Sequence, residues 1–252
     1  MATTHQPAPA LKSDRRRVAI LPIGSIEQHG PYLPVDTDAR IAELLAQKLS
    51  VGLGEEMALL LPALPFSCSW EHAGLGTVAL TVTTLAATIH DIAKSLMRWE
   101  TPFLLLLVNW HGGNDLLGAL ATEITAVEQI PCAVIPGSAQ VGAAWERSRM
   151  TTAKDVHGGA IETGIMRAYW PELVPEAISG DAHFEPQIAP AKTQPVLQAI
   201  GSYGITRQGI WGAPEDADPE KARILIEQLV QSMVVQVKAL LELVDQHQGQ
   251  GV

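Results

Sequence analysis

The chain has 252 residues and a formal net charge of −10, from 17 Lys and Arg against 27 Asp and Glu. A composition that is 47% hydrophobic and 17% charged excludes a disordered chain, and the length fits one α/β domain. The only basic run, Arg15–Arg17, is short, so neither nucleic acid nor an anionic membrane surface is expected as a partner. The apolar runs fall short of the roughly 20 residues of a membrane span.

Cysteine usage and the N-terminal segment bear on the compartment. Cys68 and Cys132 cannot form a disulfide framework or a Cys-rich zinc site, and the N-terminal segment has no apolar signal-peptide core. We therefore expect a cytoplasmic protein. Its expected organisation is a flexible lead-in at 1–16, one domain at 17–246 and a flexible tail at 247–252.

Hydrophobic periodicity predicts alternating strands and helices in chain order. Strands are expected at 18–23, 59–64, 103–108 and 132–135, and helices at 37–52 (with Thr37 as N-cap), 84–99, 115–129 and 218–244. The Pro- and Gly-rich interval 171–214 is expected to form long loops. Because the strands are apolar on both sides and helices separate them, the pattern predicts a parallel sheet covered on both faces.

Two polar, glycine-containing turns follow predicted strands. The first carries Glu27, His29 and Asp38, and the second carries His111. Ligands of open α/β sheets bind at the carboxyl ends of strands, so these four side chains are expected to converge. Imidazoles and carboxylates without thiolates suit one or two divalent ions such as zinc, manganese or iron.

Each cluster also has a simpler interpretation. Glu27 and His29 can belong to a surface turn, and Asp38 can cap the helix that follows it. The turn at 111–114 can hold an anion at a helix N-terminus. A third cluster places His157 at the mouth of a helix and Glu162 one turn inside, which also fits an ordinary capped helix.

Five segments resemble the motifs of the creatininase family of metal-dependent amidohydrolases. The first motif is long and specific, and the others follow it in the family's order. They read LPIGSIEQHGPYLPVDTD at 21–38, EHAGLGT at 71–77, NWHGGN at 109–114, HGGAIET at 157–163 and GIWGAP at 209–214. The resemblance covers most of the chain.

The resemblance implies a fold and a metal centre. The fold would be a single-domain three-layer α/β/α sandwich with a mostly parallel central sheet, and the chain would form a homo-oligomer, with the hexamer common in the family as the expected form. Two divalent ions (zinc, manganese or iron) would share an activated water. Their ligands would be Glu27, His29, Asp38 as the bridge, and His111, with Glu162 completing the second ion.

The chain departs from the family's motifs at several positions. Tyr32 stands where the family often has a second His, and Trp110 replaces a small Gly, so both are predicted to line the substrate pocket together with His72. Gly113 lacks the carboxylate that creatininases proper carry two residues after the His. Ala160 and Gly164 replace a usual Glu and Ser, which removes one carboxylate near the site. The missing carboxylate at Gly113 and the lack of an aromatic pair around 153–157 favour another amide over creatinine as the substrate.

The predicted function is hydrolysis of an amide-type C–N bond of a small molecule by a metal-activated water. His157 is the predicted proton donor or oxyanion partner, and Glu162 is the alternative proton shuttle. Three other functions stay open. They are a peptidase that trims a precursor peptide, as mycofactocin-type family members do, a catalytically impaired metal-binding member, and a metal-free α/β binding module.

Overall fold

A parallel sheet forms the centre of the molecule. The computed structural model describes residues 2–11, 17–54, 56–99, 104–179, 182–186, 188, 193–206 and 208–249. Its strands follow the order β1-β3-β2-β4-β5, and all neighbouring pairs are parallel. The strands are β1 (Ala2–Thr3), β2 (Val18–Ile23), β3 (Ala58–Leu60), β4 (Leu104–Asn109) and β5 (Cys132–Ile135).

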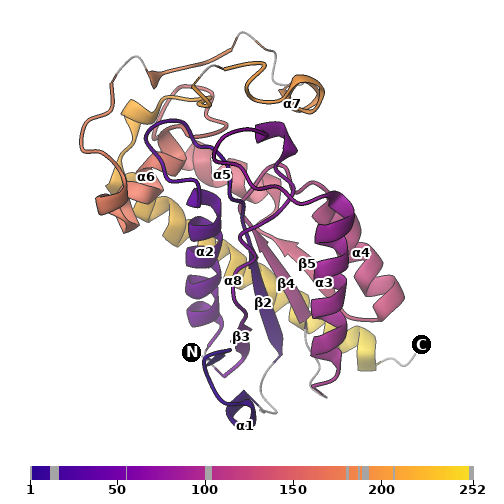
Figure 1. The fold of residues 1–252 in the computed structure, drawn as a ribbon. Helices are drawn as coiled ribbons and strands as arrows, with labels where there is room; N and C mark the ends of the chain where they lie inside the picture. The colour runs from indigo at the N-terminus through magenta and orange to yellow at the C-terminus, as the bar shows by residue number, and fades with distance from the viewer. Residues whose placement is uncertain are drawn as a thin grey trace.

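Helices cover both faces of this sheet (Figure 1). Helices α2, α5, α6 and α8 pack on one face, and α3 and α4 pack on the other. The helices are α1 (Ala8–Leu11), α2 (Thr37–Leu53), α3 (Val82–Met97), α4 (Leu116–Glu128), α5 (Ser138–Ser148), α6 (Ala160–Tyr169), α7 (Thr193–Ile200) and α8 (Pro219–Gly249), with short 3-10 turns η1 (Trp70–His72), η2 (Pro171–Leu173) and η5 (Pro214–Asp216).

The central strands explain the three layers. Successive residues of β2 point to opposite faces, so Ile20 belongs to the core under α2 and α8 while Leu21 belongs to the core under α3 and α4. Both strands β2 and β4 are almost fully buried, as a two-sided parallel sheet requires. The predicted three-layer α/β/α fold is therefore confirmed.

Several predicted boundaries differ from the structure. The first helical residue of α2 is Thr37, whose hydroxyl donates to the Pro34 carbonyl, and the N-cap position belongs to Asp36. Strand β3 is shorter than predicted, because Pro62 has no N–H for a ladder and Leu64 makes only an isolated bridge to β2. Residue 103 of the predicted strand 103–108 lies outside the described residues.

The C-terminal part contains more helix than the sequence patterns indicated. Helix α5 was not predicted, and α7 lies inside the interval 171–214 that was expected to be loop. Both are short, so their periodic signal is weak. The predicted helix after His157 begins at Ala160 as α6.

Helix α8 closes the face that α2, α5 and α6 share. Asp218 caps it as predicted, because its Oδ1 accepts from the N–H groups of Glu220 and Lys221 at 2.9 and 3.1 Å. By length and composition α8 is apolar enough to cross a membrane, but its Ile226, Leu229 and other apolar residues pack into the core here. Helix α8 ends at Gly249, beyond the predicted domain end at 246, and strand β1 lies inside the predicted lead-in at 1–16. The domain bounds of 17 and 246 stay predictions.

Candidate metal centre

The turn between β2 and α2 brings three predicted ligands together. Gly24 lies against the first turn of α2, where a Cβ would overlap the Ala39 backbone. Ser25 Oγ donates to Glu27 Oε2 at 2.8 Å, and His29 Nδ1 donates to the Glu27 carbonyl at 3.1 Å. Asp38 follows in the first turn of α2. The turn thus aims Glu27, His29 and Asp38 at one volume at the carboxyl end of the sheet.

The turn between β4 and α4 supplies His111. The Asn109 side chain donates to the His111 carbonyl at 2.9 Å, and the Asn114 side chain donates to Asn109 Oδ1 at 2.9 Å. His111 Nε2 donates to the Cys68 carbonyl at 2.8 Å. This bond leaves Nδ1 of a neutral His111 ring without a hydrogen. Nδ1 faces the carboxylates of Glu27 and Asp38.

The N-terminus of α6 adds Glu162. Its Oε2 accepts from Gly158 N at 2.7 Å, and the Asp155 carboxylate caps the helix by accepting from the N–H groups of Ala160 and Ile161 at 3.0 and 2.7 Å. Burial raises the pKa of Asp155 to about 6. This capped turn holds Glu162 against His29.

The ligand atoms form two adjoining groups that share Asp38. On one side, His111 Nδ1 lies 3.2 Å from Glu27 Oε2 and 3.1 Å from Asp38 Oδ2. On the other, His29 Nε2 lies 3.3 Å from Asp38 Oδ1 and 3.7 Å from Glu162 Oε2. Ligands about 2.1 Å from a tetrahedral ion stand roughly 3.4 Å apart, so each of these four separations fits two ligands of one divalent ion. Glu27, Asp38 and His111 lie close enough together to surround an ion, and so do His29, His157 and Glu162.

The hydrogen bonding of the cluster fits a cation. Within the described part of the chain, the buried atoms Glu27 Oε1 and His29 Nε2 have no hydrogen-bond partner. His29 Nδ1 and His111 Nε2 each donate to a backbone carbonyl, so in the neutral rings the lone pairs of the opposite nitrogens face carboxylates. Backbone carbonyls orient metal-binding imidazoles in this way, and a cation removes the repulsion between lone pairs.

Electrostatics agree with this arrangement. Burial lowers the pKa of His29, but Asp38 and Glu162 outweigh it and raise that pKa to about 10. Burial also lowers the pKa of His111, but the carboxylates of Glu27 and Asp38 outweigh it and raise that pKa well above 6.5. Burial raises the pKa of Glu162 to about 7. Without a metal ion, the site therefore retains protons on the two ligand imidazoles.

Two further histidines lie beside Glu27. His72 Nε2 is 3.6 Å and His157 Nδ1 is 3.5 Å from Glu27 Oε1, and the two rings stack with centroids 4.0 Å apart. Burial, together with the other imidazoles, lowers the pKa of both. The structure thus places His72, predicted to bind substrate, and His157, predicted to be catalytic, together at the edge of the candidate centre.

Trp110 and Tyr32 are the other two residues that were predicted to bind substrate. Trp110 is 6% exposed and belongs to the core under α8, with its ring 6.4 Å from that of Trp145. Tyr32 is half-buried on the turn between β2 and α2. Trp110 therefore packs behind the turn that carries His111.

Sequence reasoning missed two residues that contact this cluster. Glu71 Oε1 lies 3.4 Å from His111 Nε2, and it occupies the space that a side chain at Gly113 would need. Gln28 contacts both His72 and His157. Gln28 stands between two predicted ligands in the sequence, but a strand-like turn alternates side chains, which gave no reason to aim it inward.

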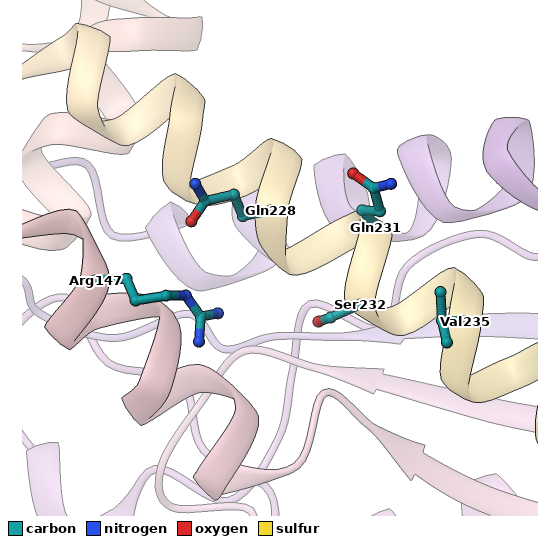
Figure 2. Close-up of a pocket in the computed structure, with 5 residues that line it drawn as sticks. All are labelled: Arg147, Gln228, Gln231, Ser232 and Val235. Atoms are coloured by element: carbon teal, nitrogen blue, oxygen red, sulfur yellow. The ribbon is translucent and has the colours of Figure 1, made fainter.

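A groove between α5 and α8 is separate from these residues (Figure 2). Its lining contains none of the predicted site residues and consists of Arg147, Gln228, Gln231, Ser232 and Val235. The chemistry of the molecule is concentrated instead at the carboxyl end of the sheet.

Comparisons with known proteins identify the family. A sequence profile of the creatininase family, described as creatinine amidohydrolase, matches residues 2–237. The chain belongs to the creatininase family. As a creatininase-family protein it is an amidohydrolase, the class that hydrolyses amide C–N bonds.

Individual relatives and solved structures agree with this assignment. The chain is 27% identical over 228 residues to the mycofactocin precursor peptide peptidase of Mycolicibacterium smegmatis, covering 88% of this chain and 84% of that protein. A crystal structure of creatinine amidohydrolase superposes with a TM-score of 0.77 at 22% identity, covering 95% of this chain and 98% of that one. A mutant creatininase of the Zn-Zn type gives a TM-score of 0.76 at 21% identity, covering 95% of this chain and 98% of that one.

Proposed function

We propose that this creatininase-family protein hydrolyses an amide C–N bond with two divalent ions per chain. Glu27, Asp38 and His111 would hold one ion, and His29, Asp38 and Glu162 would hold the other. The observation that carries the proposal is the position of Asp38, whose two oxygens lie 3.3 Å from His29 Nε2 and 3.1 Å from His111 Nδ1. Glu27 lies beside His111, and Glu162 lies beside His29. When bound, a divalent ion lowers the pKa of its water towards about 7 and polarises a carbonyl.

The protein's own groups would complete the chemistry. His157 is largely buried at the edge of the centre, and its lowered pKa keeps the ring neutral and able to accept a proton. His72 lies on the same side of Glu27. We assign substrate handling to this pair and metal binding to Glu162, because Glu162 Oε2 lies 3.7 Å from His29 Nε2.

The proposed native metal is zinc, with manganese or iron as alternatives. The donor set contains imidazole nitrogens and carboxylate oxygens only, which suits all three ions. The likeness of the fold to a Zn-Zn type creatininase supports zinc, and the likeness to a manganese creatininase supports manganese as the first alternative. Elemental analysis of protein purified without chelator tests the choice, and a protein that binds none of these ions after incubation would overturn the metal centre.

The proposed substrate is a small amide, lactam or formamide. The second candidate is a short peptide, favoured by the match to a peptide peptidase over 88% of this chain. The metal-loaded protein should be incubated with panels of both kinds, and products should be identified by mass spectrometry. Release of an amine from small amides alone supports the first, and cleavage near a peptide C-terminus supports the second. A fully metal-loaded protein that hydrolyses neither would favour an impaired, metal-binding member.

We also propose a cytoplasmic homo-oligomer, with a hexamer as the expected form. Large apolar side chains are exposed around η1 and the loop that follows it, where Trp70 is 59% and Leu75 is 95% exposed. Contact with a second copy would cover such residues. Light scattering coupled to gel filtration tests the proposal, and a monomer at micromolar concentration would contradict it.

A further inference from the structure

Gln28 occupies a tightly defined place beside the candidate centre. Its Oε1 accepts from Gly30 N at 3.0 Å, and its Nε2 donates to the Gly209 carbonyl at 3.2 Å. Because a backbone N–H only donates and a carbonyl only accepts, these two bonds fix which end of the amide is oxygen and which is nitrogen. Gly209 has a φ of +77°, and a Cβ there would overlap the Gln28 amide.

The backbone of Gln28 fixes the hydrogen of His157. His157 Nε2 lies 2.6 Å from the Gln28 carbonyl oxygen, so this nitrogen carries the hydrogen and donates it. In the neutral ring Nδ1 then has a free lone pair. That lone pair points to the space beside Glu27, whose Oε1 is 3.5 Å away.

The side chain of Gln28 fixes the hydrogen of His72. Gln28 Nε2 has two hydrogens, and one of them goes to Gly209. For the other, His72 Nδ1 at 3.0 Å and His157 Nε2 at 3.3 Å are in reach. His157 Nε2 already carries a hydrogen and cannot accept, so His72 Nδ1 accepts. The hydrogen of His72 is therefore on Nε2, which faces Glu27 Oε1 at 3.6 Å.

We propose that Gln28 is a positioning residue that presents an N–H of His72 and a lone pair of His157 to the same space beside Glu27. The two rings have the same tautomer but opposite orientations, so one offers a hydrogen and the other accepts one. Glu27, His72 and His157 are also close enough to surround an ion. The hydrogen on His72 Nε2 prevents this nitrogen from binding an ion, so we assign the group to contact with substrate instead of a third metal site.

The catalytic role of this arrangement rests on the proposed hydrolase function. As the water oxygen bonds to the amide carbon, its proton passes to His157 Nδ1. The same proton passes from His157 to the leaving nitrogen as the C–N bond breaks, which restores the neutral ring and balances the reaction. The His72 N–H stays in place and donates a hydrogen bond to the carbonyl oxygen as that atom becomes negative.

Nitrogen-15 NMR of histidine-labelled, zinc-loaded protein tests the tautomers directly, with signals assigned from the His72→Asn and His157→Asn variants. We expect hydrogen on Nε2 and none on Nδ1 in both rings. In Gln28→Glu the side chain no longer has an amide N–H to donate, so His72 Nδ1 should become protonated. His157 should not change, because it is held by the backbone carbonyl of residue 28.

Two controls separate this effect from general disturbance. Gln228→Glu, an exposed position on α8 in the groove of Figure 2, makes the same chemical change and should leave both rings unchanged. Zinc content should be equal in all three proteins. On any hydrolysed amide, Gln28→Glu should lower kcat about a hundredfold with little change in KM, the scale of a misplaced acid–base group.

A His72 ring protonated on Nδ1 in the unmodified protein would overturn the proposal, and so would a His72 signal unmoved in folded Gln28→Glu. Because the unmodified protein already tests the assignment, a variant that does not fold leaves it testable. The NMR result is independent of turnover. A protein with the expected tautomers that hydrolyses no amide would refute the proposed function and leave the positioning role of Gln28 intact.

Discussion

The candidate centre is built from two regions that differ in how they are held. The turns after β2 and β4 supply Glu27, His29, Asp38 and His111, and they are anchored to the two central strands of the sheet. The segment at 155–162 supplies His157 from the turn before α6 and Glu162 from the first turn of that helix, whose N-terminus the Asp155 carboxylate caps. We therefore expect the two regions to differ in role: the turns after β2 and β4 would supply most of the metal ligands, and the later segment would supply Glu162 to the second ion and His157 for proton transfer.

Asp38→Asn is the strongest test of the sheet-borne region. The two oxygens of Asp38 face His29 and His111 on opposite sides, so we expect the variant to lose both ions and at least about a thousandfold in activity. Elemental analysis and circular dichroism measure metal and fold together. Asp36→Asn is the matched control, because Asp36 is two residues away and pairs with Arg40 at the surface. Full metal content in folded Asp38→Asn would contradict the shared-bridge assignment.

His157→Asn tests the other side of the comparison. The ring lies beside Glu27 but donates its N–H to the Gln28 backbone, so its loss should spare the ions. We expect kcat to fall by about a hundredfold to a thousandfold, with metal content unchanged. Steady-state kinetics with elemental analysis give both quantities. Loss of an ion together with activity would move His157 from proton transfer to the metal ligands.

Glu162→Gln tests whether Glu162, in the later segment, binds metal or transfers protons. Glu162 belongs to the later segment but faces His29 at 3.7 Å, which we interpret as a contribution to the second ion. The amide should still accept from Gly158, so the fold should persist while one ion is bound more weakly by about tenfold to a hundredfold. Competition with a chromophoric chelator measures the affinity. Unchanged affinity with lost turnover would instead make Glu162 the proton shuttle.

The same division describes what the sequence could predict. Strands β2 and β5 were predicted to the residue, because both are continuously apolar in sequence, although only β2 is buried along its whole length. The polar turns after β2 and β4 were predicted to meet because the carboxyl ends of parallel strands lie at one edge of a sheet. The contacts of Gln28 with His72 and His157 could not be predicted. They join segments that are 44 and 129 positions apart, and no local pattern encodes such long-range contacts.

Gly113→Ala tests a long-range contact of the sheet-borne region. A Cβ at this position would overlap the Glu71 carboxylate and lie 2.5 Å from the Cys68 carbonyl oxygen, so His111 and its neighbours must shift. Overpacking of about 2 kcal/mol should lower Tm by about 4–8 °C. Gly112→Ala is the matched control, because nothing lies within 4 Å of its Cβ. Calorimetry should give a lower Tm for Gly113→Ala than for Gly112→Ala. Equal Tm values would show that Glu71 and its neighbours can shift without a cost in stability.

The smallest expected effect is the release of protons when ions bind to the unmodified protein. The number of protons released distinguishes the histidines of the two regions. The pKa of His29 is raised to about 10 and that of His111 well above 6.5, so at pH 7 both rings carry a proton that an arriving ion must displace. His157, whose pKa is lowered, is already neutral and contributes no proton. Metal binding should therefore release protons, and the affinity should rise with pH by about tenfold per unit for each proton released, up to the raised pKa values.

Isothermal titration calorimetry in two buffers of different ionisation enthalpy counts these protons. About two should come from the histidines, with a fraction more from Glu162, whose pKa is about 7. Binding without proton release would contradict binding of the ions by protonated His29 and His111.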